Sequence, residues 1–276
     1  MSTSPIDFVA AWAAAMRRRP SKRLDPAEDR AFWQQYAAEY DVRAGSAGAV
    51  PRCLALVAGL LGPDDTLLDV GAGTGRFTLP LARHVRSVTA LDQSAAMLDM
   101  LERKASLHGI TNIRRVEADW PNASVEPHDV VLAAWSLYRQ LDIGAALARL
   151  VAVTRRTLVV LDGVGNDPPH RPLFERYFGA WSESELPNHL YLAGALWQQG
   201  LLAEVRIVTE TRIIAGETAH AIAGQLAPLN TPPEVVTALA YDLAPLLAPH
   251  EDGYRYVYQQ AAGVVIWHAD CETQRR

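Results

Sequence analysis

The distribution of apolar and polar positions divides the chain into a helical first part, a middle part of short apolar runs, and a less regular last part. Residues 6–17 place apolar side chains at helical spacing, which predicts an amphipathic helix. A second helix is expected to begin at Asp25-Pro26, because a proline in the first turn after an aspartate cap favours a helix start. A third helix is expected over 50–61, after a flexible joint at 45–48.

The middle part has the pattern of a parallel sheet covered by helices on both faces. A strand that is buried on both faces is apolar throughout, whereas a strand with one wet face alternates. Short apolar runs predict strands over 66–70, 87–91, 112–117, 129–134 and 157–161. Stretches with helical periodicity separate them, at 76–84, 94–108 and 143–153.

The last part of the chain adds two strands and several insertions. Alternation predicts a strand over 205–214, and a second run predicts a closing antiparallel strand over 257–268. Residues 164–189 have the composition of an insertion, 190–200 form a predicted helix, and 217–249 carry broken helical patterns. We therefore expect an α/β fold that is Rossmann-like and doubly wound, with a seven-stranded, mostly parallel sheet and an antiparallel last strand.

Composition narrows the class of protein. The chain has 276 residues, of which 49% are hydrophobic and 21% charged, so it is not a disordered chain or a small disulfide scaffold. The formal charge of −5 counts against a protein built for nucleic acid or anionic membranes, although arginines and lysines cluster over 17–23. No apolar run reaches the roughly 18 residues of a membrane span, and no secretory signal is visible, so we expect a cytoplasmic protein. Cys53 and Cys271 are too far apart to indicate a zinc site, and no metal is expected.

The chemistry is concentrated in a glycine-rich loop between the first strand of the middle part and its helix. Glycines at 71, 73 and 75 let the backbone turn sharply and let a ligand approach closely. Arg76 stands where the dinucleotide fingerprint G-x-G-x-x-G has its last glycine, which disfavours a nicotinamide cofactor. Asp69 before the loop would repel a pyrophosphate and suits a ligand with an ammonium group. A turn that only reverses the chain is the alternative.

Two further strand ends support a nucleoside site. Asp92 ends the second strand, where a carboxylate can accept both hydroxyls of a ribose. Asp119 ends the third strand, and with Trp120 it offers a carboxylate and a ring for the edge and face of an adenine. Because parallel strands bind ligands at their carboxyl ends, Asp69, Asp92 and Asp119 are expected at one edge.

These motifs resemble those of the class I S-adenosylmethionine-dependent methyltransferases, over residues 66–161. The matching stretches are Leu67–Gly75, Ala90–Ser94 and Val116–Trp120. The resemblance implies S-adenosylmethionine as cofactor and S-adenosylhomocysteine as product. It also implies a division of one domain (1–276) into an N-terminal helical lid (1–63), a cofactor-binding core (64–163) and acceptor-side insertions with closing strands (164–276).

The resemblance also implies roles for single residues. Glycines of the loop would wrap the methionine and ribose, Asp69 would hold the amino group, and Asp119 would accept from the adenine amine. A helical stripe of aromatic residues resembles the family's lid, with a plain core stripe as the alternative. The implied cofactor residues are Trp33, Tyr36, Tyr40, Asp69, Gly71, Gly73, Gly75, Asp92, Gln93, Met97, Asp119, Trp120 and Trp135.

The acceptor is less well defined than the cofactor. Trp135 and Tyr138 follow the fourth strand and are candidates for an acceptor wall, while Arg139 is expected on the surface or against an anionic acceptor. No residue is assigned as a catalytic base, since the sulfonium already activates the methyl group. We expect a small-molecule acceptor. An RNA or protein methyltransferase and a non-catalytic cofactor-binding subunit remain the alternatives, and the oligomeric state is left open.

Overall fold

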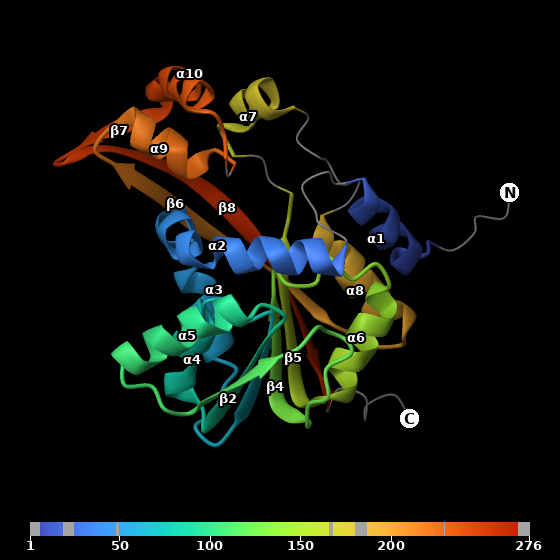
Figure 1. The fold of residues 1–276 in the computed structure, drawn as a ribbon. Coiled ribbons are helices and arrows are strands. Elements are labelled where there is room, and N and C mark those ends of the chain that lie inside the picture. The colour runs from blue at the N-terminus through green and yellow to red at the C-terminus, as the bar shows by residue number, and fades with distance from the viewer. Residues whose placement is uncertain are drawn as a thin grey trace, which may run out of the picture.

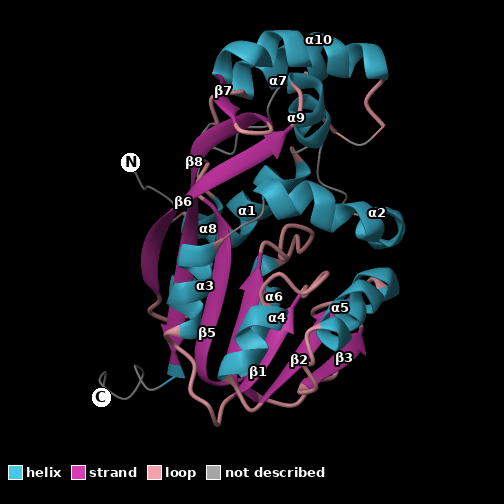
Figure 2. Cartoon of the chain, turned by 90° about the vertical axis from the view of Figure 1, so that its left-hand side faces the viewer, coloured by secondary structure: helices cyan, strands magenta, loops and turns pink. Residues whose placement is uncertain are grey.

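The computed structural model describes residues 6–18, 25–47, 50–165, 168–179, 187–228 and 230–269. A twisted sheet forms the centre, helices cover both of its faces, and one long helix crosses above the carboxyl ends of its parallel strands (Figure 1). Figure 2 shows that two strands continue beyond the sheet into a separate group of helices. The polar site residues therefore lie between the sheet edge and the elements above it.

The sheet has eight strands. The order is β3-β2-β1-β4-β5-β8-β6, and β7 pairs with β8 off this path. The strands are β1 (Thr66–Val70), β2 (Ser87–Asp92), β3 (Ile113–Glu117), β4 (His128–Ala134), β5 (Thr154–Gly163), β6 (Glu204–Gly216), β7 (Leu247–His250) and β8 (Gly253–His268). The seven expected strands all form, and the expected mostly parallel fold is confirmed; β7 is an addition within the segment for which only helical patterns were recognised.

Strand β8 explains how the sheet changes direction. Strands β1 to β5 pair in parallel, whereas β8 is antiparallel to both β5 and β6. The last strand of the chain thus inserts between β5 and β6. Its residues Ala262–Trp267 are buried on both sides of the sheet, which accounts for their continuous apolar sequence.

Three hydrophobic clusters attach the helices to the sheet. One face carries α1 (Phe8–Arg17), α6 (Ile143–Ala152) and α8 (Asn188–Gln198), packed around fully buried side chains such as Trp12 and Tyr191. The other face carries α3 and α4 with residues such as Val57 and Phe77, and α5 packs beside them on Ala90. The bounds of these elements are α3 (Pro51–Ala58), α4 (Thr78–Leu81), the short 3-10 helix η1 (Ala82–His84) and α5 (Ala95–Leu107).

Helix α2 (Pro26–Ala47) is the element above the strand ends. It begins where the Asp25 carboxylate accepts from the backbone N–H groups of Ala27 and Glu28, as the predicted helix start requires. The expected joint at 45–48 is wrong for residues 45–47, which belong to the helix, and Gly48 lies outside the described residues. The arginine and lysine cluster at 17–23 is described only as far as Arg18.

The remaining elements form what we call the arm: α7 (Arg171–Phe178), α9 (Ala219–Leu226), α10 (Pro233–Leu243), the 3-10 helix η2 (Ala244–Leu246), β7, and the parts of β6 and β8 that these cover. The arm has its own buried cluster, which includes Ile214 of β6, Tyr256 of β8 and Leu239 of α10. Residues 164–189, expected as an insertion, contain α7. The arm rises beside α2 rather than extending the sheet sideways (Figure 2).

Two helical glycines of the fold give opposite predictions for replacement by alanine. A Cβ at Gly194 of α8 would lie 2.4 Å from the ring of Phe8, so Gly194→Ala forces α1 away and lowers the free energy of unfolding by about 1–3 kcal/mol. A Cβ at Gly224 of α9 meets nothing closer than Val236 at 3.9 Å, so Gly224→Ala raises it by up to about 1 kcal/mol. Urea unfolding of the two variants checks both signs, and equal effects would show that the α1–α8 contact is not close.

Candidate functional site

A pocket opens between the glycine loop, the carboxyl ends of β1 to β4 and helix α2. All of the predicted cofactor residues except Tyr36 and Gly75 line it. Side chains that were not on that list also line it: Asp29, Arg76, Phe77, Ser136, Tyr138, Arg139 and Gln140. The topology brings these residues together because every parallel strand ends at the same edge.

The glycine loop follows β1 directly. Gly71 and Gly73 have φ values of 77° and 55°, in the left-handed region that favours glycine. A Cβ on Gly71 would lie 2.3 Å from the Cβ of Ser136, so the loop after β1 and the loop after β4 pack backbone against side chain here. The Ser136 Oγ is buried and has no hydrogen-bond partner, which leaves a polar atom for a ligand at this point of the pocket.

Asp69 lies beneath the glycine loop, and its side chain is almost fully buried. Its carboxylate accepts a 2.6 Å hydrogen bond from the Oγ1 of Thr78. The pKa of Asp69 is raised to about 6, mainly by burial; the Thr78 hydrogen bond opposes the rise and the nearby Asp92 charge adds to it. The group is therefore a carboxylate that a neighbouring cation would help to ionise.

Asp92 connects the end of β2 to the glycine loop. One carboxylate oxygen accepts from the backbone N–H of Gly73 at 2.9 Å, and the other accepts from the N–H of Ser94 at 2.9 Å. Burial raises the pKa of Asp92, and these two hydrogen bonds oppose the rise. Since each carboxylate oxygen has a second lone pair, both keep acceptor capacity toward the pocket.

The residues expected around an adenine differ in exposure. The Asp119 side chain is 24% exposed and accepts from Arg139 through one oxygen. Met97 is buried against the pocket. Trp120 lines the pocket too, but its ring belongs to the main core cluster and its indole N–H donates to the Ala146 carbonyl. Its expected place against an adenine ring stays a prediction, because most of the ring is engaged in the core.

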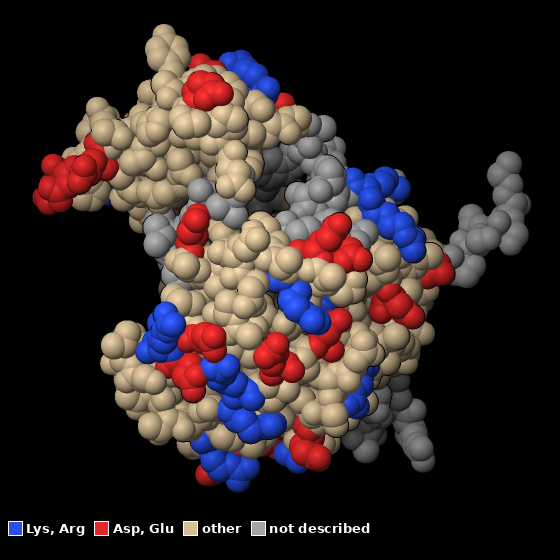
Figure 3. Space-filling view, in the orientation of Figure 1, with Lys and Arg blue, Asp and Glu red and all other residues tan. Residues whose placement is uncertain are grey.

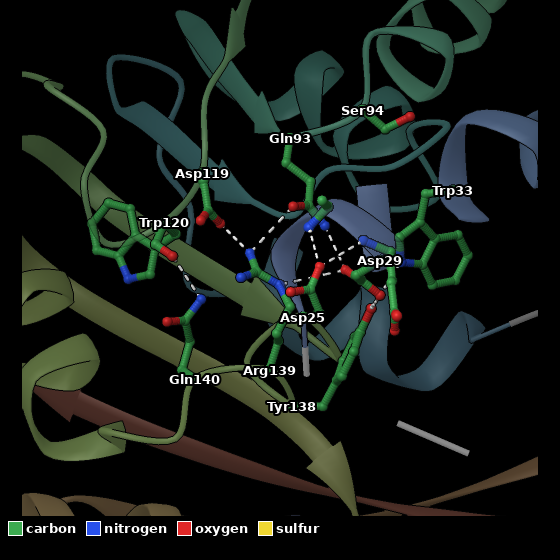
Figure 4. Close-up of polar contacts among 12 residues, drawn as sticks. Asp25, Asp29, Trp33, Gln93, Ser94, Asp119, Trp120, Tyr138, Arg139 and Gln140 are labelled. Carbon is green, nitrogen blue, oxygen red and sulfur yellow. Dashed lines mark hydrogen bonds and ion pairs between the residues drawn. The ribbon is translucent and has the colours of Figure 1, made fainter. Parts of the chain in front are cut away.

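Asp29 of α2 is the centre of a polar network that spans the pocket rim (Figure 4). The residue is 1% exposed, and its carboxylate accepts from Gln93 Nε2 and from the Tyr138 hydroxyl at 2.8 Å. Arg139 Nε lies 3.5 Å from the same carboxylate, while Nη2 of Arg139 donates to Asp119. The network therefore joins α2 to the ends of β2, β3 and β4.

Arg139 excludes one of the two alternatives considered for it. Its side chain is 9% exposed, so the expectation of a surface arginine is wrong, whereas a contact with an anionic acceptor stays a prediction because Arg139 lines the pocket. Tyr138, expected in an acceptor wall, lines the pocket but also accepts a 2.8 Å hydrogen bond from the Trp33 indole N–H. Tyr138 and Arg139 could be recognised in the sequence as candidate site residues because they follow the end of β4. Asp29 gave none, because its burial depends on how α2 crosses the strand ends.

Aromatic side chains form the wall opposite the acidic strand ends. Trp33 and Tyr40 of α2 line the pocket, with ring centroids 5.8 Å apart. Trp135, after β4, has a φ of 52°, which is uncommon for a side chain of its size. Its ring lies 6.0 Å from that of Phe77. The wall is therefore shared between α2 and the loop after β4.

Tyr36 and Gly75 lie just outside the pocket lining. The ring of Tyr36 contacts the rings of Phe32, Trp33 and Tyr40, and so it packs against the two α2 residues that line the pocket. Gly75 has a φ of 90°, and a Cβ there would lie 2.8 Å from Leu79 and 3.0 Å from Leu101. The last glycine of the loop is thus required by helix packing, and its expected contact with the cofactor stays a prediction.

Metal ligands, a membrane span and a reactive thiol would be other classes of site in the described ranges. No group of three His, Cys, Asp or Glu residues there is arranged to hold a metal ion. No helix there is long and apolar enough to cross a membrane. Cys53 is a buried free thiol whose pKa burial raises to about 12, and Cys271 lies outside the described residues.

Comparison with known proteins identifies the core. A family model described as "Methyltransferase domain" matches residues 67–157. An uncharacterised protein of Haemophilus influenzae is 33% identical over 162 residues, which cover 56% of this chain and 58% of that protein. A probable cobalt-precorrin-6B C(15)-methyltransferase (decarboxylating) of Methanothermobacter thermautotrophicus is 36% identical over 83 residues, covering 30% and 43%. The chain thus spans about half the length of these relatives.

Solved structures agree on the fold. A SAM-dependent methyltransferase of Thiobacillus denitrificans in complex with S-adenosylhomocysteine has a TM-score of 0.54 at 15% identity, covering 83% of this chain and 96% of that one. This coverage is larger than the share of the chain that the family model matches. Residues 67–157 therefore match a methyltransferase domain, and the fold of the chain is that of S-adenosylmethionine-dependent methyltransferases.

Proposed function

We propose that this protein transfers the methyl group of S-adenosylmethionine to a small-molecule acceptor. The observation that carries the proposal is the junction of the glycine loop with Asp92, where the Gly73 N–H and the carboxylate hold each other in place beside an open pocket. Asp69 and Asp119 line the same pocket at the neighbouring strand ends. A nucleoside with an amino-acid end matches this order of groups.

The residues of the chain would bind the cofactor along the strand ends. Asp92 accepts from the ribose hydroxyls through its remaining lone pairs, and Asp119 accepts from the adenine amine through the oxygen that Arg139 leaves open. Met97 packs on the adenine. Asp69, aided by the polar Ser136 hydroxyl, faces the ammonium group. The glycines at 71 and 73 allow the ligand to approach the backbone.

S-adenosylmethionine supplies a methyl group that is already activated by the sulfonium. The chain then has to align the acceptor with that methyl group and exclude water, which the aromatic wall of Trp33, Tyr40, Trp135 and Tyr138 is placed to do. No side chain is assigned as a general base, because a base is needed only for an acceptor that must lose a proton. S-adenosylhomocysteine is the product.

A small acceptor is favoured over a macromolecule by the form of the site. Helix α2 crosses above the pocket and is tied to its rim through Asp29, which restricts the opening. Figure 3 shows charges of both signs interspersed on the face that it displays, without an extended basic surface. One relative is named for a precorrin substrate, which is also a small molecule. On this proposal residues 1–63 are the lid, 64–163 the cofactor core and 164–276 the acceptor side.

Calorimetric titration of the full chain with S-adenosylhomocysteine, with NAD as the negative ligand, tests the cofactor assignment. We expect Asp92→Ala to weaken binding by about 10- to 100-fold, since a charged acceptor of two hydroxyls is lost. Glu117→Gln is the matched control, because Glu117 is an exposed carboxylate that ends the next strand and is not among the residues that line the pocket. Unchanged affinity in Asp92→Ala would overturn the assignment.

The raised pKa of Asp69 predicts a pH dependence of binding. The carboxylate must be ionised to pair with an ammonium group, and with a pKa of about 6 its ionised fraction rises about tenfold from pH 5 to pH 7. We therefore expect the Kd for S-adenosylhomocysteine to fall by about that factor over the same range. The dependence should vanish in Asp69→Asn; if it persists there, Asp92 or another group is responsible.

The Asp29 network predicts how α2 is held. Asp29→Asn removes the charge that faces Arg139 and Tyr138, and we expect it to lower the free energy of unfolding by about 1–3 kcal/mol. Amide exchange in α2 should become faster, because its tie to the strand ends is weakened. Glu28→Gln, on the exposed side of the same turn, should change stability by no more than about 0.5 kcal/mol. Similar effects of both substitutions would argue against the network.

A further inference from the structure

The charges of the pocket lining are unequal in number and in pairing. Its carboxylates are Asp29, Asp69, Asp92 and Asp119, and its guanidinium groups are Arg76 and Arg139. Arg139 is already paired, through Asp119 on one side and Asp29 on the other. The partner of Arg76, the other guanidinium group of this lining, is therefore the open question.

Arg76 contacts the lid rather than an acid. Its Nη2 donates to the Tyr40 hydroxyl at 2.8 Å, and its guanidinium carbon lies 5.3 Å from the centre of the Tyr40 ring. Within the described part of the chain it makes no ion pair with a carboxylate. A planar guanidinium held on one side by a tyrosine keeps its remaining N–H donors for an anion.

Arg212, a nearby arginine, differs from Arg76 in having an acidic side chain beside it. Arg212 of β6 is buried, and burial lowers its pKa. The Arg76 charge lowers that pKa too, while the buried Glu210 carboxylate opposes the change, so these groups lie in one region. Arg212 has a buried acid beside it and donates to Gln260 Oε1 at 2.7 Å. Arg76 faces the pocket instead.

The position of Arg76 in the loop indicates which end of the pocket it serves. It follows Gly75 directly, on the loop that begins at Gly71. The Ser136 hydroxyl, buried and without a partner, lies over Gly71 and lines the same pocket. This end thus holds an unpaired cation and an unused hydroxyl, both suited to a charged polar group of a ligand.

We propose that Arg76, oriented by Tyr40, binds the methionine carboxylate of S-adenosylmethionine. The inference rests on the proposed function and assigns the one charged group of the cofactor that the strand-end acids cannot hold. Asp69 faces the ammonium and Arg76 the carboxylate, so the amino-acid end is read as a zwitterion. Because Tyr40 belongs to α2, the contact also ties the lid to the loaded pocket.

The test compares ligands that differ only at this end. Kd values are measured by calorimetry for S-adenosylmethionine, for decarboxylated S-adenosylmethionine, which lacks the carboxylate, and for methylthioadenosine, which lacks the whole amino-acid end. The full-length chain should prefer S-adenosylmethionine over the decarboxylated compound by about 10- to 100-fold, the range of a hydrogen-bonded charge pair. In Arg76→Gln this preference should fall to within about threefold, and Arg76→Lys should keep part of it.

Internal controls separate the outcomes. Arg83→Gln alters an exposed arginine a short way along the same segment and should keep the full preference. Methylthioadenosine should bind Arg76→Gln as it binds the unmodified chain; a loss there would place the defect in the whole pocket and overturn the inference. An unchanged preference in Arg76→Gln would also overturn it, because the carboxylate would then be bound without Arg76. If the unmodified chain binds none of the three ligands, the proposed function itself fails.

Discussion

The site depends on one constraint: carboxylate side chains are buried at one edge of the sheet. A buried carboxylate is costly unless its oxygens accept hydrogen bonds or face a cation. Asp92 satisfies this with backbone N–H groups and so fixes the glycine loop, whereas Asp29 needs Gln93, Tyr138 and Arg139 from two different strand ends. The glycine loop, helix α2 and the sheet edge therefore have to fold together, and the pocket lies between these elements.

The fold followed from the sequence where burial on both faces gives continuous apolar runs. Strands β1, β2, β4 and β5 and the second half of β8 are of this kind, and so their existence was accessible. Strand β7 could not be predicted in this way, since it has four residues, includes Pro249 and pairs with the beginning of β8. The helix through Gly45 was missed because a glycine costs a helix only about 1 kcal/mol, which neighbouring turns offset.

The residues of the site, too, were predictable from the sequence in some cases and not in others. Asp69, Asp92 and Asp119 were found because a parallel topology alone places strand ends together. The bond from Tyr138 to Asp29 joins residues 109 positions apart, and no local pattern marks either of them as a partner. Gly75 shows the converse, since its motif suggested a ligand contact while Leu79 and Leu101 require the missing side chain. Local sequence thus indicates which backbone conformation is needed more readily than the reason for it.

The long pairing of β6 with β8 restricts how the arm can move. Its register is unbroken from Glu204 opposite Ile266, within the sheet, to Gly216 opposite Tyr254, within the arm. A sharp hinge between the arm and the sheet would strain the ladder that both parts share, so we expect the arm to move with the sheet rather than separately from it. On the proposed function, the entry and release of ligands would then depend on the movement of α2, and their rates on the side chains that fasten this helix.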